Sequence, residues 1–173
     1  IINADSMQVY RDFSILSSRP LKKDLKKIKH HLYGFISSKK HFSTGAWLSL
    51  AKEKIKLCLK KKKIPILVGG TGLYFEAITK GMSKIPNIDF KKRNKIRNLQ
   101  VKLGQKEFYK KLLAIDPLVK SKIEPFDSHR SIRAYEVKKF TKKSLYEWFK
   151  NTKSNYLESD FFKVYIDYPR QEL

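Results

Sequence analysis

The sequence predicts an α/β core that is interrupted by an all-helical insert, and three observations support this. Residues 1–4 and 66–68 are short apolar segments that run directly into polar or glycine-rich backbone, as parallel strands do at their carboxyl ends. An amphipathic helical pattern separates the two segments. After Pro86 the pattern indicates only helices and turns until about Tyr156. The expected domains are therefore an α/β core over 1–88, a helical insert over 89–158 and a return to the core over 159–173.

The elements of the core follow from local sequence. Ser43 and Thr44 can cap the main helix, and Trp47, Ala51 and Ile55 recur along it at helical spacing. The elements expected before the second apolar strand are a strand over 1–4, a loop over 5–20 with room for a short helix, a lysine-rich connector over 21–29, a short strand over 30–35 and a helix over 46–62.

Pro65 opens the second apolar strand. Because Ile66–Val68 is apolar at every position, we expect it to be buried on both faces, as parallel strands usually are. Gly69 and Gly70 then turn the chain, and Thr71 can cap a helix that continues through Thr79. The alternation of strands and helices is typical of an α/β core.

The insert begins with a strongly basic helix over 90–103, followed by a helix over 106–115 with an apolar face. Asp127 can cap a third helix, which carries Arg130 and Arg133. The run Ser144–Glu147 has the form of a capping box and opens a fourth helix. Residues 161–166 then show strand-like alternation, which we expect to return the chain to the core.

Composition narrows the class of protein. Of 173 residues, 41% are hydrophobic, which suffices for a core, and no apolar run is long enough to span a bilayer. The single Cys58 excludes an internal disulfide framework and is expected to be a small core residue. The net charge of +23 attracts phosphate backbones. Lysine outnumbers arginine 32 to 7, however, so charge alone leaves compositional drift equally open.

Asp5 is the sharpest candidate for chemistry. A carboxylate at the carboxyl end of a strand, with Ser6 and Gln8 beside it, can accept a proton or bind the edge of a base. The alternative is that Asp5 only forms a turn or caps a helix. Residues 69–72 are not a Walker A loop, because no Gly-Lys-Ser/Thr follows, although their backbone amides and the Thr71 hydroxyl suit a phosphate or a polar substrate edge.

The scarce arginines occur in pairs at helical spacing. Arg130 and Arg133 lie three residues apart, and Arg93 and Arg97 lie four apart, so each pair shares a helix face. Such pairs are candidate RNA contacts, or else solvated faces. The four histidines show no metal-binding spacing.

Taken together, these segments resemble the tRNA dimethylallyltransferase family over essentially the whole chain. The family pattern D-S-x-Q-V-Y matches residues 5–10, and P-(I/L)-L-V-G-G-T-x-L-Y matches residues 65–74. The pattern D-P-Q-R-(I/L)-x-R-A-L-E-V resembles residues 127–137, and T-G-K-S-L-S-E-L resembles residues 141–148. His129 stands where the family has Gln, and Ser17 stands in for a Thr.

The resemblance implies a P-loop-kinase-like parallel sheet with an inserted helical tRNA-binding domain. It implies transfer of a dimethylallyl group from dimethylallyl diphosphate to N6 of the adenosine that follows a tRNA anticodon. The enzyme would be cytoplasmic and monomeric, with no membrane contact. By the matching positions, Asp5 would be the general base and the tRNA would be bound by Ser6, Met7, Gln8, Thr71, Arg93, His129, Arg130, Ser131, Ile132 and Arg133.

The resemblance also implies a phosphate loop upstream of Ile1 and further helices beyond Leu173. The Mg²⁺ that accompanies the diphosphate would take its ligands mainly from that loop, and none from this chain. We therefore expect the chain by itself to bind RNA weakly and not to transfer the dimethylallyl group.

Three other functions compete with this one. An adenylate isopentenyltransferase would share the core and Asp5, but a free nucleotide gives the long basic insert nothing to bind. A nucleotide kinase would not need the Asp-Ser-x-Gln segment, and a non-catalytic RNA-binding module would need only the charge. Transfer to an anticodon stem-loop, compared with transfer to AMP, separates these possibilities.

Overall fold

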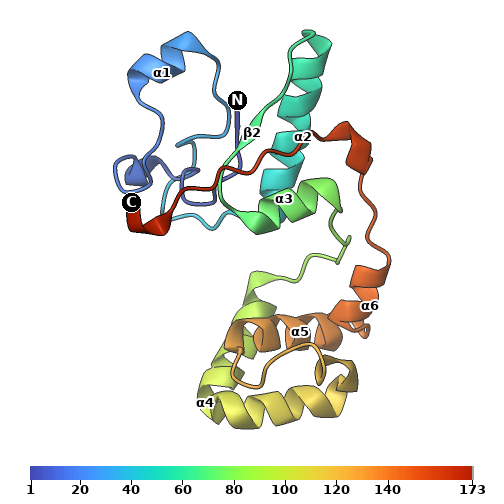
Figure 1. Ribbon diagram of the computed structural model, residues 1–173. Helices are drawn as coiled ribbons and strands as arrows, with labels where there is room; N and C mark the ends of the chain where they lie inside the picture. The colour runs from blue at the N-terminus through green and yellow to red at the C-terminus, as the bar shows by residue number, and fades with distance from the viewer. Residues whose placement is uncertain (173) are drawn as a thin grey trace. The chain divides into compact units, whose positions relative to one another are not determined.

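The computed structural model describes residues 1–172, and the chain forms two units (Figure 1). The first unit contains residues 1–81 together with the segment that starts at Ser154, and the second contains Met82–Lys153. Each unit has its own hydrophobic core. No helix in the described part of the chain is long and apolar enough to cross a membrane.

A small parallel sheet lies at the centre of the first unit. Strand β1 (Ile2–Asn3) pairs in parallel with β2 (Leu67–Val68), with Ile2 opposite Leu67 and Asn3 opposite Val68. His31 forms a single parallel bridge to Ile2 on the other side of β1. The predicted parallel pairing of the two apolar segments is therefore present, although each strand is only two residues long.

Two helices cover this sheet (Figure 1). Helix α2 (Thr44–Lys60) starts as predicted, because the Ser43 side chain accepts a hydrogen bond from the backbone of Ala46 at 3.2 Å. Helix α3 (Gly72–Thr79) packs against α2, and the rings of Trp47 and Tyr74 stack with their centroids 4.2 Å apart. This stacked pair forms the middle of the core beneath β1.

Strand β2 differs from its prediction, because its apolar residues are not buried on both faces. The exposed fraction is 86% for Ile64, 51% for Ile66 and 46% for Val68, while Leu67 is partly buried. A strand is enclosed only where helices or further strands cover it, and among the described residues nothing covers this side of β2. Cys58 is likewise only partly buried, not a core residue.

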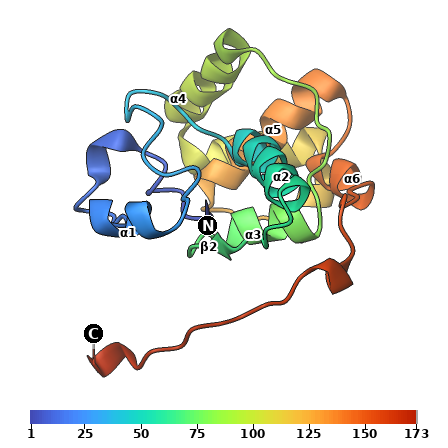
Figure 2. The ribbon, with the colours of Figure 1, turned by 90° about the horizontal axis from the view of Figure 1, so that it is seen from above.

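Three further expectations for the first unit are corrected. The connector over 21–29 contains a short helix, α1 (Lys22–Lys27), whose Asp24 carboxylate accepts a hydrogen bond from the backbone of Leu21. Residues 30–35 form no continuous strand, because Leu32 and Gly34 have positive φ angles. Residues 161–166 form an extended segment (Figure 2) that is exposed from Phe162 onward and has no strand partner among residues 1–172. Alternation makes a strand only where another edge accepts its hydrogen bonds.

The first unit also contains short 3₁₀ turns. They are η1 (Arg11–Phe13), η3 (Glu158–Asp160) and η4 (Arg170–Glu172).

The second unit is built on one long helix, α4 (Phe90–Ile115), which is bent at Gly104 (Figure 1). Gly104 has φ 72° and ψ 163°, a conformation that side chains with a Cβ rarely adopt. The two helices predicted over 90–103 and 106–115 are therefore the two arms of α4. Asp89 begins the helix by accepting hydrogen bonds from the backbone of Lys91 and Lys92.

The remaining elements of the second unit pack against α4. They are η2 (Pro117–Val119), α5 (Ser128–Thr141) and α6 (Leu145–Lys150). As predicted, Asp127 caps α5, accepting a hydrogen bond from the backbone of Arg130 at 2.9 Å, and Ser144 with Glu147 forms the capping box of α6. Phe108 and Tyr135 meet in the core with centroids 5.1 Å apart and join α4 to α5.

Candidate functional site

Asp5 lies directly after β1, with one carboxylate oxygen engaged and the other open. Its Oδ1 accepts hydrogen bonds from the backbone N–H groups of Met7 (2.7 Å) and Gln8 (3.3 Å). Oδ2 receives no hydrogen bond from the described residues. Asp5 therefore forms the turn through Oδ1, while Oδ2 remains available to a substrate.

A buried asparagine fixes the backbone around Asp5. The side chain of Asn3 is fully buried, and it donates to the carbonyls of Asp5 (2.9 Å) and Leu32 (3.0 Å) while accepting from the backbone N–H of Asp5 (2.9 Å). The indole of Trp47 donates to the Asn3 carbonyl at 2.7 Å. These contacts satisfy the polar groups of the strand end, and they hold Asp5 at one position relative to the core.

The end of β1 is joined to the start of α3 by two hydroxyl groups. The Thr71 hydroxyl accepts from the backbone N–H of Ser6 at 2.8 Å and donates to the Ser6 hydroxyl at 3.2 Å. Thr71 therefore does not cap α3 with its side chain as predicted, because its hydroxyl is engaged across the sheet. Asp5, Ser6 and Thr71, which are far apart in sequence, lie together; with Met7 and Gln8 we call them the strand-end site.

Gly69 allows this close approach. A Cβ added at Gly69 would lie 2.2 Å from the carbonyl carbon of Ala4 and 2.6 Å from the backbone nitrogen of Asp5. A Cβ at Gly70 would meet nothing within 4 Å. A side chain would therefore clash at Gly69, but it would fit at Gly70.

The other two members of the strand-end site differ in exposure. The Gln8 side-chain amide donates to the carbonyl of Ser17 at 2.7 Å, and its own oxygen accepts no hydrogen bond within the described chain. Met7 is exposed. Gln8 is thus oriented by its nitrogen and presents its oxygen, while Met7 offers an apolar surface next to it.

Two phenols, the buried Tyr74 and the half-buried Tyr33, lie within the electrostatic reach of Asp5. Burial raises the pKa of Tyr74 to about 12, and the negative charges of Tyr10 and Asp5 act in the same direction. Burial, followed by the charge of Asp5, also raises the pKa of Tyr33. The surroundings of the carboxylate therefore contain neutral phenols.

The second unit brings two of the predicted arginines together around a buried acid. Glu136 is 3% exposed, and its Oε2 lies 3.5 Å from Nη1 of Arg133 and 4.0 Å from Nε of Arg93. Arg93 comes from α4 and Arg133 from α5, so the cluster joins the two helices. We call Arg93, Arg130 and Arg133 the arginine face.

The charge balance of this cluster leaves it positive. One carboxylate serves two guanidinium groups, and the buried Nε atom of Arg93 has no hydrogen-bond partner among the described residues. Burial, and then the charge of Arg93, lowers the pKa of Arg133, while Glu136 opposes this. An anion that bound here would relieve the repulsion between the two guanidinium groups.

The remaining predicted contacts of the second unit fall into two groups. Arg130 and His129 are exposed at the start of α5, where Arg130 makes a 3.5 Å ion pair with Asp127. Ser131 is fully buried and accepts a hydrogen bond from Gln105 at 3.2 Å. Ile132 packs against the core of the unit. The structure thus places His129 and Arg130 on the surface but turns Ser131 inward, which does not support a direct contact by the Ser131 side chain.

Sequence reasoning missed Asn3 and Glu136. Asn3 lay inside the predicted strand over 1–4, and its role depends on Leu32, which is distant in sequence. Glu136 follows Arg133 by three residues, a spacing that signals an ion pair on a helix, but its contact with Arg93 follows only from the packing of α4 on α5. Among residues 1–172, no group of three or more His, Cys, Asp or Glu side chains is placed to hold a metal ion.

Comparisons with known proteins agree on one family. The sequence profile of the IPP transferase family matches residues 8–173. A tRNA dimethylallyltransferase of Pelagibacter ubique is 57% identical over 173 residues, which is 100% of this chain and 55% of that protein. One of Rickettsia massiliae is 42% identical over 99% of this chain and 47% of its own length. The chain thus spans about half the length of the curated relatives it matches.

A solved structure is also similar. The crystal structure of a eukaryotic dimethylallyltransferase acting on tRNA matches 88% of this chain and 38% of its own, with a TM-score of 0.72 and 25% sequence identity.

Proposed function

Since the chain belongs to the IPP transferase family, we propose that it carries the catalytic carboxylate and part of the RNA-binding surface of a tRNA dimethylallyltransferase. The reaction moves a dimethylallyl group from dimethylallyl diphosphate to N6 of the adenosine 3′-adjacent to a tRNA anticodon. We propose a P-loop-kinase-like arrangement for its core and the cytoplasm as its place of action. The observation that carries the proposal is Asp5, held through Oδ1 with Oδ2 open at the end of β1.

Asp5 is suited to the role of general base. The exocyclic amine of adenine is a poor nucleophile, and a positioned carboxylate that takes its proton as the bond forms contributes typically 10²- to 10⁴-fold. In the reaction the C1–O bond of dimethylallyl diphosphate breaks, the N6–C1 bond forms, diphosphate leaves, and the proton passes to Oδ2 of Asp5. The two N–H groups that bind Oδ1 keep the carboxylate in place during this step.

The neighbours of Asp5 are suited to hold the adenine. The base must leave its stack to reach the carboxylate. The open oxygen of Gln8 can accept from an amine on the base edge, and Met7 provides an apolar surface for its ring. Ser6 and Thr71 hold this segment against α3 and place their hydroxyls beside it.

The arginine face is suited to the phosphate backbone of the RNA. Arg93 and Arg133 are partly exposed and share one carboxylate, and Arg130 is 72% exposed beside them on α5. Guanidinium groups bind phosphate oxygens bidentately, which fixes the RNA without reading its sequence. We assign Ser131 and Ile132 to the packing that supports this face.

The diphosphate requires neutralisation that this chain does not fully provide. When bound, Mg²⁺ would supply the remaining positive charge at the leaving group. Among residues 1–172, no group of three or more His, Cys, Asp or Glu side chains is placed to hold a metal ion, and we assign no Mg²⁺ ligand to this chain.

The test measures transfer in a chimera in which this chain replaces the matching segment of the Pelagibacter ubique relative; we call it the chimeric enzyme. Labelled dimethylallyl diphosphate is supplied with either an anticodon stem-loop or AMP. We expect label in the stem-loop, at the adenosine that follows the anticodon, and none in AMP. Transfer to AMP alone would identify an adenylate isopentenyltransferase instead, and RNA binding without transfer to either would identify a non-catalytic module.

A further inference from the structure

The second unit contains a pocket beside the arginine face, with Arg130 and Arg133 in its lining together with residues that have no assigned role. It has a volume of about 420 Å³ and lies between α5, α6 and the segment before α5. Its lining consists of Lys122, Arg130, Arg133, Leu145, Tyr146 and Phe149. A second hollow of about 800 Å³ adjoins it and shares Lys122 and Tyr146, so Tyr146 stands between the two. We call the smaller one the aromatic pocket.

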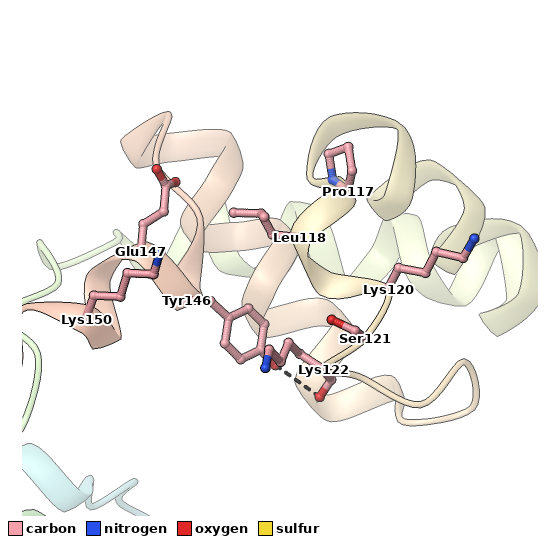
Figure 3. Close-up of a pocket in the computed structure, with 8 residues that line it drawn as sticks. All are labelled: Pro117, Leu118, Lys120, Ser121, Lys122, Tyr146, Glu147 and Lys150. Atoms are coloured by element: carbon pink, nitrogen blue, oxygen red, sulfur yellow. Dashed lines mark hydrogen bonds between the residues drawn. The ribbon is translucent and has the colours of Figure 1, made fainter.

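Two aromatic rings on α6 form one wall of the aromatic pocket. Tyr146 and Phe149 lie edge to face with centroids 5.7 Å apart, and 49% of Phe149 is exposed. Their position is fixed, because the fully buried Ser144 caps α6 and the Tyr146 hydroxyl donates to the carbonyl of Lys122 at 3.3 Å (Figure 3). Phe149 thus presents ring surface to solvent, and the partly buried Tyr146 packs both on it and on the core of the unit.

The surroundings of these rings are positively charged. Lys122, Arg130 and Arg133 line the aromatic pocket, and no acidic residue does. Lys120 and Lys150 line the adjoining hollow. The acidic residue there, Glu147, points away from Tyr146 (Figure 3), and its carboxylate accepts a hydrogen bond from the backbone of Ser144 at 2.6 Å.

Exposed aromatic rings surrounded by lysine and arginine side chains are suited to bind unpaired nucleotides. Every base has a flat face that stacks on an aromatic side chain, and its phosphate pairs with lysine or arginine. A double-stranded stem would leave the rings unused, because its bases are already stacked on one another. An acidic peptide would use the cations but not the ring surface.

We propose that the aromatic pocket binds one unpaired nucleotide of the RNA, with its base on Tyr146 and Phe149 and its phosphates on the surrounding cations. The inference rests on the proposed function, and it specifies that the helical unit recognises a single-stranded loop in addition to phosphate charge.

The experiment uses this chain and two RNA probes. One is an anticodon-type hairpin with 2-aminopurine placed at each loop position in turn, and the other is a blunt duplex of the same stem sequence. We expect the fluorescence of one loop position to be quenched by stacking when the chain binds. Tyr146→Ala and Phe149→Ala should remove that quenching and weaken hairpin binding by roughly 5- to 100-fold, with the salt dependence unchanged. Duplex binding should stay the same.

Three control variants separate stacking from charge and from folding. Tyr146→Phe keeps the ring and should retain the quenching. Phe126→Ala removes a ring that is 86% exposed in the same unit but lines neither hollow, and it should bind like wild type. Arg130→Ala should weaken both RNAs and reduce the salt dependence. A melting curve for each variant identifies unfolding, and if Tyr146→Ala unfolds, the exposed Phe149→Ala carries the test.

Two results would overturn the inference. If the alanine variants at Tyr146 and Phe149 bind the hairpin like wild type, or lose hairpin and duplex equally, the aromatic pocket does not read an unpaired base. That outcome leaves the proposed function standing. If no loop position of the hairpin is quenched when the wild-type chain binds, the inference also fails, whereas transfer by the chimeric enzyme tests the proposed function separately.

Discussion

The strand-end site and the arginine face are built in opposite ways. At the strand-end site, short side chains are tied to backbone: Asp5 and Thr71 each bind main-chain N–H groups, and Gly69 brings two segments into contact. On the arginine face, long side chains meet around one buried carboxylate, and Arg130 is largely solvated. A catalytic carboxylate must be held at one position, and backbone contacts achieve this. Attraction of an RNA backbone needs only positive charge near the phosphates, which flexible arginine side chains provide.

The largest effect is expected at the open oxygen of Asp5. Asparagine at position 5 keeps the oxygen that accepts from Met7 and Gln8 but cannot take a proton. In the chimeric enzyme, Asp5→Asn should therefore reduce single-turnover transfer by roughly two to four orders of magnitude. RNA affinity, measured by filter binding, should change by less than about twofold. Near-normal transfer by the Asp5→Asn variant would show that Asp5 is not the general base. It would also show that the strand-end site does not carry the chemistry.

A smaller effect is expected when the strand-end site is displaced but its side chains are kept. Gly69→Ala forces the backbone at Ala4 and Asp5 apart, because the new Cβ has no room. Displacing a catalytic group by about 1 Å can lower the reaction rate about 100-fold. We therefore expect the rate of transfer to fall roughly 10- to 100-fold while RNA binding persists. Gly70→Ala is the matched control and should behave like wild type, since its Cβ meets nothing. Equal behaviour of the two variants would show that the close approach does not position Asp5.

The arginine face should respond in binding and salt dependence, and not in chemistry. Replacing both Arg130 and Arg133 by Ala should weaken hairpin binding roughly 10-fold at 0.15 M salt. It should also reduce the slope of the logarithm of the binding constant against the logarithm of salt concentration by about 2. Transfer by the chimeric enzyme at saturating RNA should be close to wild type. Binding titrations at several salt concentrations test this, and an unchanged slope would assign the arginine face to solvent.

The smallest effect concerns pH and the core beneath the strand-end site. The pKa of Tyr74 is about 12 in the folded chain, above its usual value of 10, so the folded state holds this proton more tightly. Stability is therefore unaffected below about pH 10 and falls between about pH 10 and about 12, as the unfolded chain loses the proton first. Tyr74→Phe keeps the stacking on Trp47 and should show a smaller decline in denaturant titrations over that range. The same decline in both proteins would mean that other groups cause it.

How far the sequence predicted the structure depends on the range of the interactions. The strand-end site was predictable because an apolar run followed by Asp-Ser is a local pattern, and the caps at Ser43, Asp127 and Ser144 are local as well. Expectations that needed a distant partner were less successful. Residues 161–166 alternate like a strand but find no edge to pair with among the described residues.

The same reasoning explains two outcomes on α5, the unpredicted role of Glu136 and the inward orientation of the predicted contact Ser131. The role of Glu136 depends on the way α4 packs against α5, and Ser131 lies on the inner side of α5 although its neighbours Arg130 and Arg133 reach the surface. A motif names a stretch of residues, but one turn of helix distributes them between the core and solvent. The contacts that hold the strand end likewise depend on Leu32 and Trp47, far from Asn3 in the chain.

The pairing of Ile2 with Leu67 has a consequence for synthesis and folding. The second unit closes through contacts between successive helices, whereas β1 cannot pair with β2 until about 65 further residues exist. At about 5–20 residues per second, β1 waits roughly 3–13 s on the ribosome for its partner. Local helical contacts form much faster than long-range strand pairing. β1 thus emerges before the helices of the second unit but is expected to fold more slowly than they do. The apolar β1 segment is exposed to misassociation until β2 has been synthesised.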